Sequence, residues 1–382
     1  MTIATRRAWA TIDLKALRNN LARVCKLCPS SKIIPIVKAN AYGHGMVRIA
    51  VAVRDCETAV AGFGVATLDE ALKLRKSGNE MPIVLLNGFM SVEELTECLQ
   101  CNIEPVVHSD YQVRLVESIS SDSMPGHRHK FWIKYNTGMN RLGMDRALSR
   151  DSYHKLNRLP GTELVLMSHL ACADDPDNDR FSEFTQQQLK YLLHLRNELT
   201  NNMQKEVVCS LAASAGILHW PATHLDIVRP GVMLYGSSPM VQQTGEELGL
   251  QPVMTLKSRL IAIRTLEAGE SIGYGATWTC DRKTRVGTVS IGYGDGYPRS
   301  AANGTPVVVK SAGGIRRTRI IGRVSMDMIT IDLSDIDDVL IDDEVQLWGT
   351  DLSADQVARS AGTIAYELFC KLTARVPCDY IG

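Results

Sequence analysis

The chain up to about residue 240 repeats one unit: a short apolar run, a polar or glycine-containing turn, and a segment with apolar residues at helical spacing. One of these helical segments begins with a capping-box signature, Thr67 followed by Glu70. The eight apolar runs are 33–37, 62–66, 82–86, 104–107, 131–134, 164–167, 207–211 and 227–229. Apolar strands that alternate with helices predict a parallel sheet covered by helices. Eight units favour an α/β fold with an N-terminal (β/α)8 TIM barrel; an open doubly wound sheet is the alternative.

The pattern changes after Leu250, where strand-like runs are separated by glycine-rich or acidic turns. The runs are 253–265, 285–291, 306–310, 317–321, 328–333 and 344–348, with one helix-like piece at 353–360. They predict a C-terminal, mostly antiparallel β-domain. We therefore expect two domains, 1–245 and 246–382. The segment 7–12 is also strand-like and could form a strand of the second domain. A helix at 14–27 would then lead the chain into the barrel.

Charge and cysteine content argue against several classes of protein. The 382 residues contain 42 Lys and Arg and 42 Asp and Glu, so neither a nucleic-acid nor a membrane partner is expected. The first residues lack the apolar run of a secretory signal, and ten scattered cysteines are typical of a reduced, cytoplasmic protein. Two C-x-x-C pairs, Cys25 with Cys28 and Cys98 with Cys101, lie in helix-like segments without turn glycines. We interpret them as core or helix-end cysteines and expect no metal site.

In a (β/α)8 barrel the reactive groups lie where the strands end. Lys38 closes the first run, which reads IPIVKANAYGHG. Burial of a lysine at a strand end is costly and lowers its pKa, and the neutral amine is the form that makes a Schiff base with an aldehyde. Taken alone, Lys38 is equally compatible with a lysine whose ammonium group extends to solvent.

The other strand ends favour the chemical interpretation. The fifth run ends at Lys134 and leads to Arg141, and the sixth is followed by Ser168 and His169. Small residues follow the seventh run at 212–216 and the eighth at 230–231, where such barrels commonly bind phosphate. An amine, a phosphate site and an arginine for a pyridine nitrogen together suit pyridoxal 5'-phosphate.

Over its entire length the chain resembles the alanine racemases, a family of fold-type III pyridoxal-phosphate enzymes. The matching segments are IVKANAYGHG (36–45), YNTGMNRLGM (135–144), SHLACAD (168–174), AASAG (212–216), IVRPGVMLYG (227–236), IGYGAT (272–277), IGYGDGYPR (291–299) and GRVSMDM (322–328). The resemblance implies two-base interconversion of L-alanine and D-alanine, which supplies D-alanine for peptidoglycan or uses it catabolically.

The resemblance also implies roles for the catalytic and substrate-binding residues. Lys38 would carry the cofactor as an internal aldimine and act as the base for D-alanine. Tyr274 would be the base for L-alanine on the opposite face. Arg141 and the backbone N–H of Met326 would hold the substrate carboxylate. Because Tyr274 falls in the second domain, the resemblance implies a homodimer with shared active sites.

Further roles concern the cofactor. Arg229 would face the pyridine nitrogen and be held by His169. The residues implied at the phosphate are Tyr42, Ser214 and Gly231. Lys134 matches a lysine that is often carbamylated in the family and then orients the arginine corresponding to Arg141.

Several positions depart from the common family pattern. Asn136 and Asn140 replace a frequent Asp and Gly, which leaves an unmodified Lys134 as an alternative. Ser325 stands where a cysteine is frequent. Ala374 replaces a tyrosine near the phosphate and substrate entrance, which favours a pocket open to serine and other small amino acids.

Three other functions fit parts of the pattern. A broad-specificity racemase acting on serine, lysine or arginine is the main alternative. A fold-type III decarboxylase typically carries Glu at the position of Arg229 and a Cys-Asp pair at the position of Met326 and Asp327. A pyridoxal-phosphate homeostasis protein resembles the barrel alone and would lack the domain that carries Tyr274.

Overall fold

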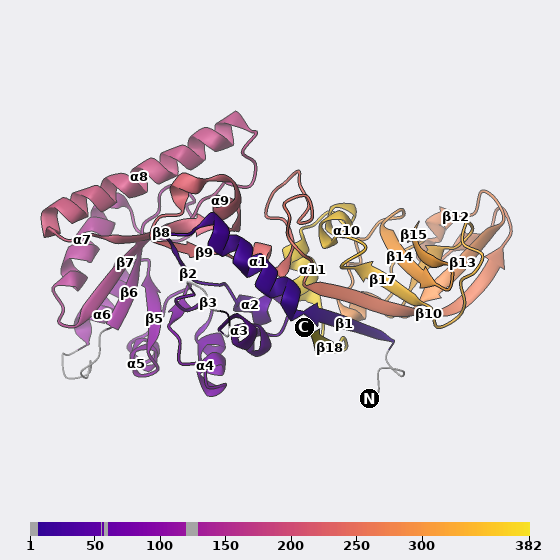
Figure 1. Cartoon of the computed structure of the whole chain (residues 1–382), viewed down its shortest axis with the longest axis horizontal. Coiled ribbons are helices and arrows are strands. Elements are labelled where there is room, and N and C mark those ends of the chain that lie inside the picture. The colour runs from indigo at the N-terminus through magenta and orange to yellow at the C-terminus, as the bar shows by residue number, and fades with distance from the viewer. Residues whose placement is uncertain (1–6, 55, 57–59, 120–128) are drawn as a thin grey trace.

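The computed structural model describes residues 7–54, 56, 60–119 and 129–382. A barrel and a sheet-rich domain lie side by side along the long axis of the molecule (Figure 1). Helix α1 (Leu14–Leu27) lies between them and is capped by Asp13, whose side chain accepts hydrogen bonds from the N–H groups of Lys15 and Ala16. No helix in the described part of the chain is long and apolar enough to cross a membrane.

Eight parallel strands form the barrel in the order β2-β9-β8-β7-β6-β5-β4-β3. They are β2 (Lys32–Ile33), β3 (Phe63–Val65), β4 (Ile83–Leu85), β5 (Ile103–Val107), β6 (His129–Lys134), β7 (Thr162–Met167), β8 (Val208–Ala213) and β9 (Ile227–Arg229). The parallel bridges Ile33 to Val60 and Ile36 to Gly64 join the two ends of this order. The predicted TIM barrel is therefore confirmed, and each of the eight predicted runs overlaps one of its strands.

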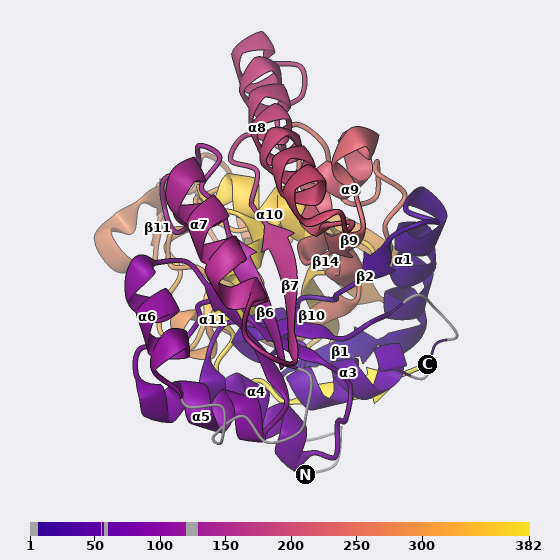
Figure 2. The same cartoon turned by 90° about the vertical axis from the view of Figure 1, so that its left-hand side faces the viewer.

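The barrel strands are covered by helices, which Figure 2 shows around β6 and β7. The helices are α2 (Lys38–Tyr42), α3 (Met46–Arg54), α4 (Leu68–Lys76), α5 (Val92–Gln100), α6 (Asp110–Ser118), α7 (Arg146–Asn157), α8 (Asp179–Met203) and α9 (Ser214–His219). In α4, α5 and α6 a Thr or Ser side chain just before the helix accepts the N–H of the third helical residue, which satisfies one of the exposed N–H groups of a helix start.

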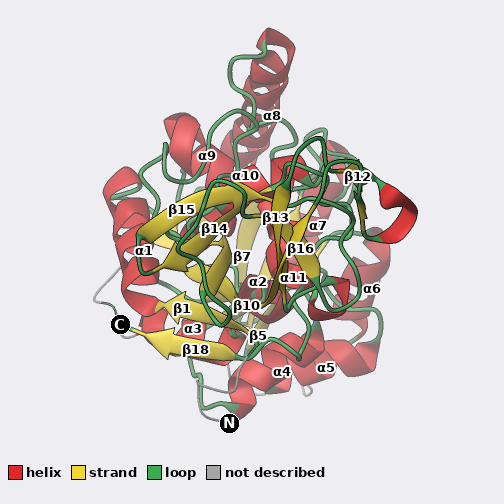
Figure 3. Cartoon of the chain, turned by 90° about the vertical axis from the view of Figure 1, so that its right-hand side faces the viewer, coloured by secondary structure: helices red, strands yellow, loops and turns green. Residues whose placement is uncertain are grey.

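The second domain is a mostly antiparallel sheet, as predicted, and faces the viewer in Figure 3. Its strands run in the order β15-β14-β17-β10-β1-β18, and β13 pairs with β10 and β16. The strands are β1 (Ala8–Asp13), β10 (Met254–Leu266), β13 (Thr284–Val289), β14 (Pro306–Ser311), β15 (Gly314–Arg319), β16 (Ile329–Asp332), β17 (Glu344–Trp348) and β18 (Cys378–Ile381), with a separate pair β11 (Ser271–Ile272) and β12 (Trp278–Thr279). Strand β1 pairs antiparallel with β10 and parallel with β18, so the segment 8–13 lies in this sheet.

The C-terminal part contains elements that the sequence pattern did not predict, among them the strand pair β11 and β12, strand β18 and helix α11 (Ala365–Lys371). The predicted helix at 353–360 is observed as α10 (Ala354–Ser360). Helix α11 packs on α2, and the approach is close: a Cβ atom at Gly43, whose φ is +77°, would lie 2.3 Å from the carbonyl oxygen of Phe369. The second domain therefore contacts the first strand end of the barrel.

One apolar core spans both parts of the molecule. It includes Leu17 and Val37 on the barrel side and Leu256 and Trp348 on the sheet side, all buried. Cys28 and Cys98 are buried in the same core, in agreement with their interpretation as core cysteines. A continuous core of this kind holds the two parts in one orientation.

Candidate active site

Lys38 begins α2, which is a left-handed turn rather than a regular helix. The four residues after it, 39–42, have φ values between +51° and +56°. A left-handed conformation costs a residue other than glycine about 1–2 kcal/mol, so the surroundings must hold the turn in place. Asn40 does so from within, because its carbonyl accepts the N–H of Gly45 at 2.9 Å and its Oδ1 accepts the N–H of Met46 at 3.0 Å.

Four cations act on one another at the ends of the barrel strands: Lys38, Lys134, Arg141 and Arg229. Burial is the largest cause that lowers the pKa of Lys38, and Arg141 lowers it further. The pKa of Lys134 falls to about 8 because of burial and then the charges of Arg229, Arg141 and Lys38. In the described part of the chain none of the four lies within 4.0 Å of a carboxylate oxygen. The cluster is therefore suited to anionic groups and to a neutral amine.

Arg229 is buried at the end of β9, opposite Ala213 in the neighbouring strand β8. Its guanidinium donates to the Ser168 carbonyl at 2.6 Å, to the Leu211 carbonyl at 3.1 Å and to the Ser210 hydroxyl. Burial lowers its pKa to about 10. These hydrogen bonds fix the planar guanidinium group of Arg229 at the ends of β7, β8 and β9.

His169 lies 3.5 Å from Arg229, measured between its Nδ1 and the guanidinium nitrogen. Burial is the main cause that lowers the pKa of His169 to about 3, and Arg229 and Lys134 add to it. The imidazole is therefore neutral at physiological pH. A neutral ring beside an arginine can accept a hydrogen bond from it.

A narrow space lies where β8 and β9 end. The Ser214 hydroxyl accepts the N–H of Gly231 at 2.9 Å and that of Met233 at 3.4 Å. A Cβ atom at Gly231 would lie 2.7 Å from the hydroxyl oxygen of Tyr42, so only glycine leaves this space open. The Tyr42 ring itself is buried, with its centroid 4.9 Å from that of Tyr235 and 5.9 Å from that of Tyr366.

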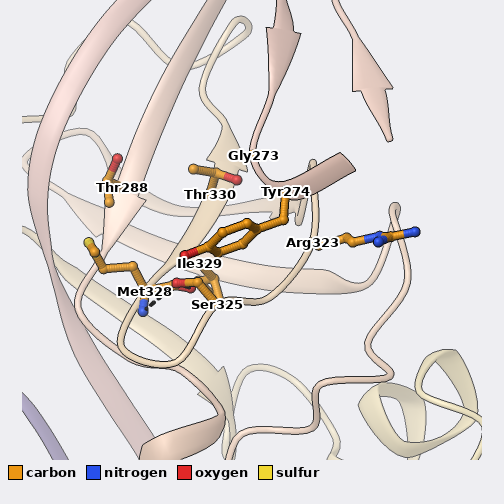
Figure 4. A pocket seen from close by; sticks show the side chains of 8 residues that line it. All are labelled: Gly273, Tyr274, Thr288, Arg323, Ser325, Met328, Ile329 and Thr330. Atoms are coloured by element: carbon orange, nitrogen blue, oxygen red, sulfur yellow. Dashed lines mark hydrogen bonds between the residues drawn. The ribbon is translucent and has the colours of Figure 1, made fainter. Parts of the chain in front are cut away.

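Tyr274 and Met326 lie apart from this cluster, in the second domain. Tyr274 is 72% exposed and Met326 is 53% exposed. Tyr274 lines a pocket of about 430 Å³ whose lining residues all belong to the second domain: Gly273, Tyr274, Thr288, Arg323, Ser325, Met328, Ile329 and Thr330. In Figure 4 the Tyr274 ring lies over the loop that carries Ser325 and Met328, and Arg323 points away from the ring.

The loop of Met326 is firmly held. Its carbonyl accepts the N–H of Gly294 at 2.8 Å. The next residue, Asp327, pairs with Arg375 at 2.8 Å, and Arg375 also contacts the buried Asp295 at 3.1 Å. The backbone around Met326 is thus fixed although its side chain is exposed.

Both parts of the chain match known protein-family models. Residues 12–239 match the model of the alanine racemase N-terminal domain, and residues 253–380 match that of the alanine racemase C-terminal domain. The chain belongs to the alanine racemase family. Alanine racemase of Vibrio cholerae is 46% identical to it over 377 residues, which cover 98% of each chain.

Solved structures of alanine racemases have the same fold. The biosynthetic alanine racemase of Pseudomonas aeruginosa superposes with a TM-score of 0.90 at 42% identity, covering 99% of this chain and 100% of that one. The alanine racemase of Bartonella henselae with covalently bound pyridoxal phosphate gives a TM-score of 0.84 at 29% identity, covering 98% of this chain and 99% of that one. The alanine racemase family depends on pyridoxal phosphate.

The residues present fit that cofactor. Gly231 leaves space beside Tyr42 and Ser214 for a phosphate, and hydrogen bonds to the Ser168 and Leu211 carbonyls fix Arg229 at the strand ends. The pKa of Lys38 is lowered, which favours the amine that a covalent link needs.

The structure also reveals polar residues that the sequence analysis did not select. Gln188 of α8 is fully buried and donates to the Thr137 hydroxyl at 3.1 Å and to the His169 carbonyl at 3.0 Å. Thr137 in turn contacts the Ser168 hydroxyl at 2.8 Å. This network ties the loop that leads to Arg141 to the loop after β7. A buried glutamine within a helical pattern carries no sequence signal of such a role.

Proposed function

We propose that this protein interconverts L-alanine and D-alanine with pyridoxal 5'-phosphate as its cofactor. The observation that carries the proposal is Lys38, a half-buried lysine with a lowered pKa inside a cation cluster at the carboxyl ends of the barrel strands. Membership in the alanine racemase family supports the same reaction.

We assign the following binding roles to the residues at the strand ends. Lys38 is the covalent attachment point, Arg229 faces the ring nitrogen, and the phosphate sits among Tyr42, Ser214 and Gly231. The bound cofactor withdraws electrons from the α-carbon of the substrate, which makes its proton acidic. An arginine at the ring nitrogen keeps that nitrogen unprotonated and so limits electron withdrawal, which disfavours transamination. His169 stays neutral beside Arg229 and can accept a hydrogen bond from its guanidinium.

Racemisation needs one base on each face of the α-carbon. Lys38 moves the proton on one face, and we assign Tyr274 to the other. A phenol with an ordinary pKa near 10 is a poor base, so it needs cations nearby. Arg141 and Arg229 supply such charges if Tyr274 enters the site of a second copy of the chain.

We therefore propose a homodimer with shared active sites. The exposed Tyr274 and Met326 belong to a surface that a partner would cover, and each barrel would receive both residues from its partner. Arg141 and the Met326 N–H would then hold the substrate carboxylate from two subunits. We propose further that the dimer is cytoplasmic and that its D-alanine feeds peptidoglycan synthesis or is consumed as a nutrient.

We also propose that Lys134 is carbamylated. A lysine with a pKa of about 8 has an appreciable neutral fraction near pH 7, and only the neutral amine reacts with carbon dioxide. Three cations around it would stabilise the negative carbamate and would orient Arg141. The Asn136 side chain, which holds Asn140 at 2.8 Å, shapes the loop between the two. A mass increase equal to one carbon dioxide on the Lys134 peptide would test this modification.

The test of the proposed function has two parts. Borohydride reduction of the purified protein should fix the cofactor to Lys38, which mass spectrometry of the peptide detects. Loss of optical rotation should then be measured with L-alanine, L-serine and L-lysine. We expect alanine to react fastest; comparable rates with serine or lysine would instead favour a broad-specificity racemase, to which the exposed Ala374 would contribute. Absence of any cofactor on Lys38 would refute the proposal.

A further inference from the structure

Helices α4, α5 and α6 begin with the same capping arrangement, but the capping side chain of α4 makes an additional contact with another part of the barrel. Each has a Thr or Ser before its first residue and a Glu or Gln three positions later: Thr67 with Glu70, Ser91 with Glu94, and Ser109 with Gln112. In all three the Glu or Gln side chain accepts a backbone N–H just before the helix. This reciprocal capping stabilises helix starts and has no further role in most proteins.

Glu70 makes one contact that its counterparts lack. Its Oε2 accepts the N–H of Ala66 at 2.8 Å and that of Thr67 at 3.3 Å, which is the capping role. Its Oε1 accepts the N–H of Ala39 at 2.6 Å, across 31 positions of the chain. Ala39 directly follows Lys38, so the cap of α4 reaches the first amide after the reactive lysine.

That amide belongs to the left-handed turn. Residues 39–42 have positive φ values, and such a turn persists only where neighbouring groups hold it. Asn40 holds its distal half through Gly45 and Met46. Glu70 holds its proximal half with a charge-assisted hydrogen bond, a type about twice as strong as a neutral one.

The carboxylate also acts on Lys38 through its charge. The groups that act electrostatically on Lys38 come from four elements: Arg141 from the loop after β6, Lys134 from β6, Cys370 from α11, and Glu70 from α4. Arg141 favours the neutral amine, whereas Glu70 and Cys370 oppose it. Glu70 therefore favours the protonated form of the lysine nitrogen.

We propose that Glu70 is a positioning residue for Lys38: its carboxylate anchors the left-handed turn at Ala39 and holds a negative charge beside the lysine nitrogen. The proposal rests on the function proposed above for Lys38. A glutamine cannot replace it fully. Its single oxygen can accept from Ala39 or from Ala66 and Thr67, but its amide then faces N–H groups on the other side.

The test compares Glu70→Gln with Glu94→Gln, a matched change at the same position of the next helix, where the carboxylate accepts the N–H of Met90 at 2.7 Å and no strand-end lysine is involved. The first measurement is a pH titration of the visible absorbance of the lysine-bound cofactor in the holoenzyme. Glu70→Gln should shift the midpoint to lower pH, since a negative charge is lost, whereas Glu94→Gln should leave it unchanged. With L-alanine, Glu70→Gln should lower kcat about tenfold and change KM less than about twofold, because the group that moves the proton is displaced while the carboxylate site is intact.

The second measurement is hydrogen–deuterium exchange of the segment 38–45, which reports the anchor without depending on the cofactor. Exchange should be about tenfold faster in Glu70→Ala than in the native protein, as expected for the loss of one charge-assisted hydrogen bond. Glu70→Asp keeps the charge but is too short to bridge both sides, so it should speed exchange while leaving the absorbance midpoint near that of the native protein. Thermal unfolding of Glu94→Gln measures the loss of the cap alone, and Glu70→Gln should be destabilised more because it also weakens the anchor at Ala39.

An unchanged rate of hydrogen–deuterium exchange in Glu70→Ala would refute the claim that Glu70 anchors the turn at Ala39. An unchanged absorbance midpoint in Glu70→Gln would refute the claim that its charge acts on the Lys38 nitrogen. A native protein with no cofactor on Lys38 would instead refute the proposed function, and the exchange measurement would still decide whether Glu70 holds the turn.

Discussion

A methyl group at Gly231 would test the phosphate site directly. In Gly231→Ala the added Cβ atom would lie 2.7 Å from the Tyr42 hydroxyl oxygen and 3.8 Å from the Ser214 hydroxyl oxygen. Ordinary van der Waals contact begins at 3.4 Å, so the Tyr42 hydroxyl would have to retreat by about 0.7 Å. Its ring is packed between Tyr235 and Tyr366, which resist such a movement.

The cost of this overpacking is expected to be about 1–3 kcal/mol. If the displaced hydroxyl is one that the cofactor phosphate requires, the cost appears in binding and weakens cofactor affinity by about 5- to 150-fold. The affinity is measured by titrating pyridoxal phosphate into the apo-protein and following absorbance or fluorescence. Far-ultraviolet circular dichroism should be unchanged.

A double-mutant cycle identifies the cause. Tyr42→Phe removes the atom that clashes, so Gly231→Ala should cost less in the Tyr42→Phe background than in the native one. If the two affinity losses simply add, the clash with Tyr42 is not the cause. An affinity unchanged by Gly231→Ala would refute the assignment of this space to the phosphate.

Two further predictions concern the cation cluster. In bicarbonate-free buffer Lys134→Met should raise the free energy of unfolding at pH 7 by up to about 3 kcal/mol, because the folded protein disfavours the charged lysine. The gain should shrink as the pH rises from about 8 towards 10.5, where the unfolded state also loses the proton, and chemical denaturation at several pH values would show a constant gain if this reasoning were wrong. Arg229→Glu should protonate the ring nitrogen and cause pyridoxamine phosphate to accumulate during turnover of alanine; chromatography of the released cofactor that detects none would contradict the role given to Arg229.

The barrel was predictable because its signal is local and repeated. Each strand is a continuous apolar run, and capping residues such as Thr67 mark the helices between them. The sequence also predicted that the second domain is a mostly antiparallel sheet, but it did not predict every strand of that sheet. Strand β18 exists because it pairs with β1, more than 360 positions away, and four residues alone carry too little periodicity to predict it.

The candidate active site likewise contains residues that the sequence indicated and contacts that only the folded chain reveals. Rules for strand ends selected Lys38, Lys134, His169 and Arg229, which act on one another electrostatically in the structure, while their roles stay predictions. The contact of Glu70 with Ala39 could not be predicted, because the capping box explains the glutamate completely at the level of the sequence. Gln188 was missed for a related reason, since its partners lie on two loops that meet only in the folded barrel.

The central claim is that each active site combines Lys38 of one subunit with Tyr274 of another. Inactive Lys38→Ala and Tyr274→Phe variants should be mixed in equal amounts, dissociated, reassociated and assayed for racemisation of L-alanine. Random pairing makes half of the dimers mixed, and each mixed dimer has one intact site of two, so the account predicts recovery of about one quarter of the native activity. A mixture that stays as inactive as its components would contradict it.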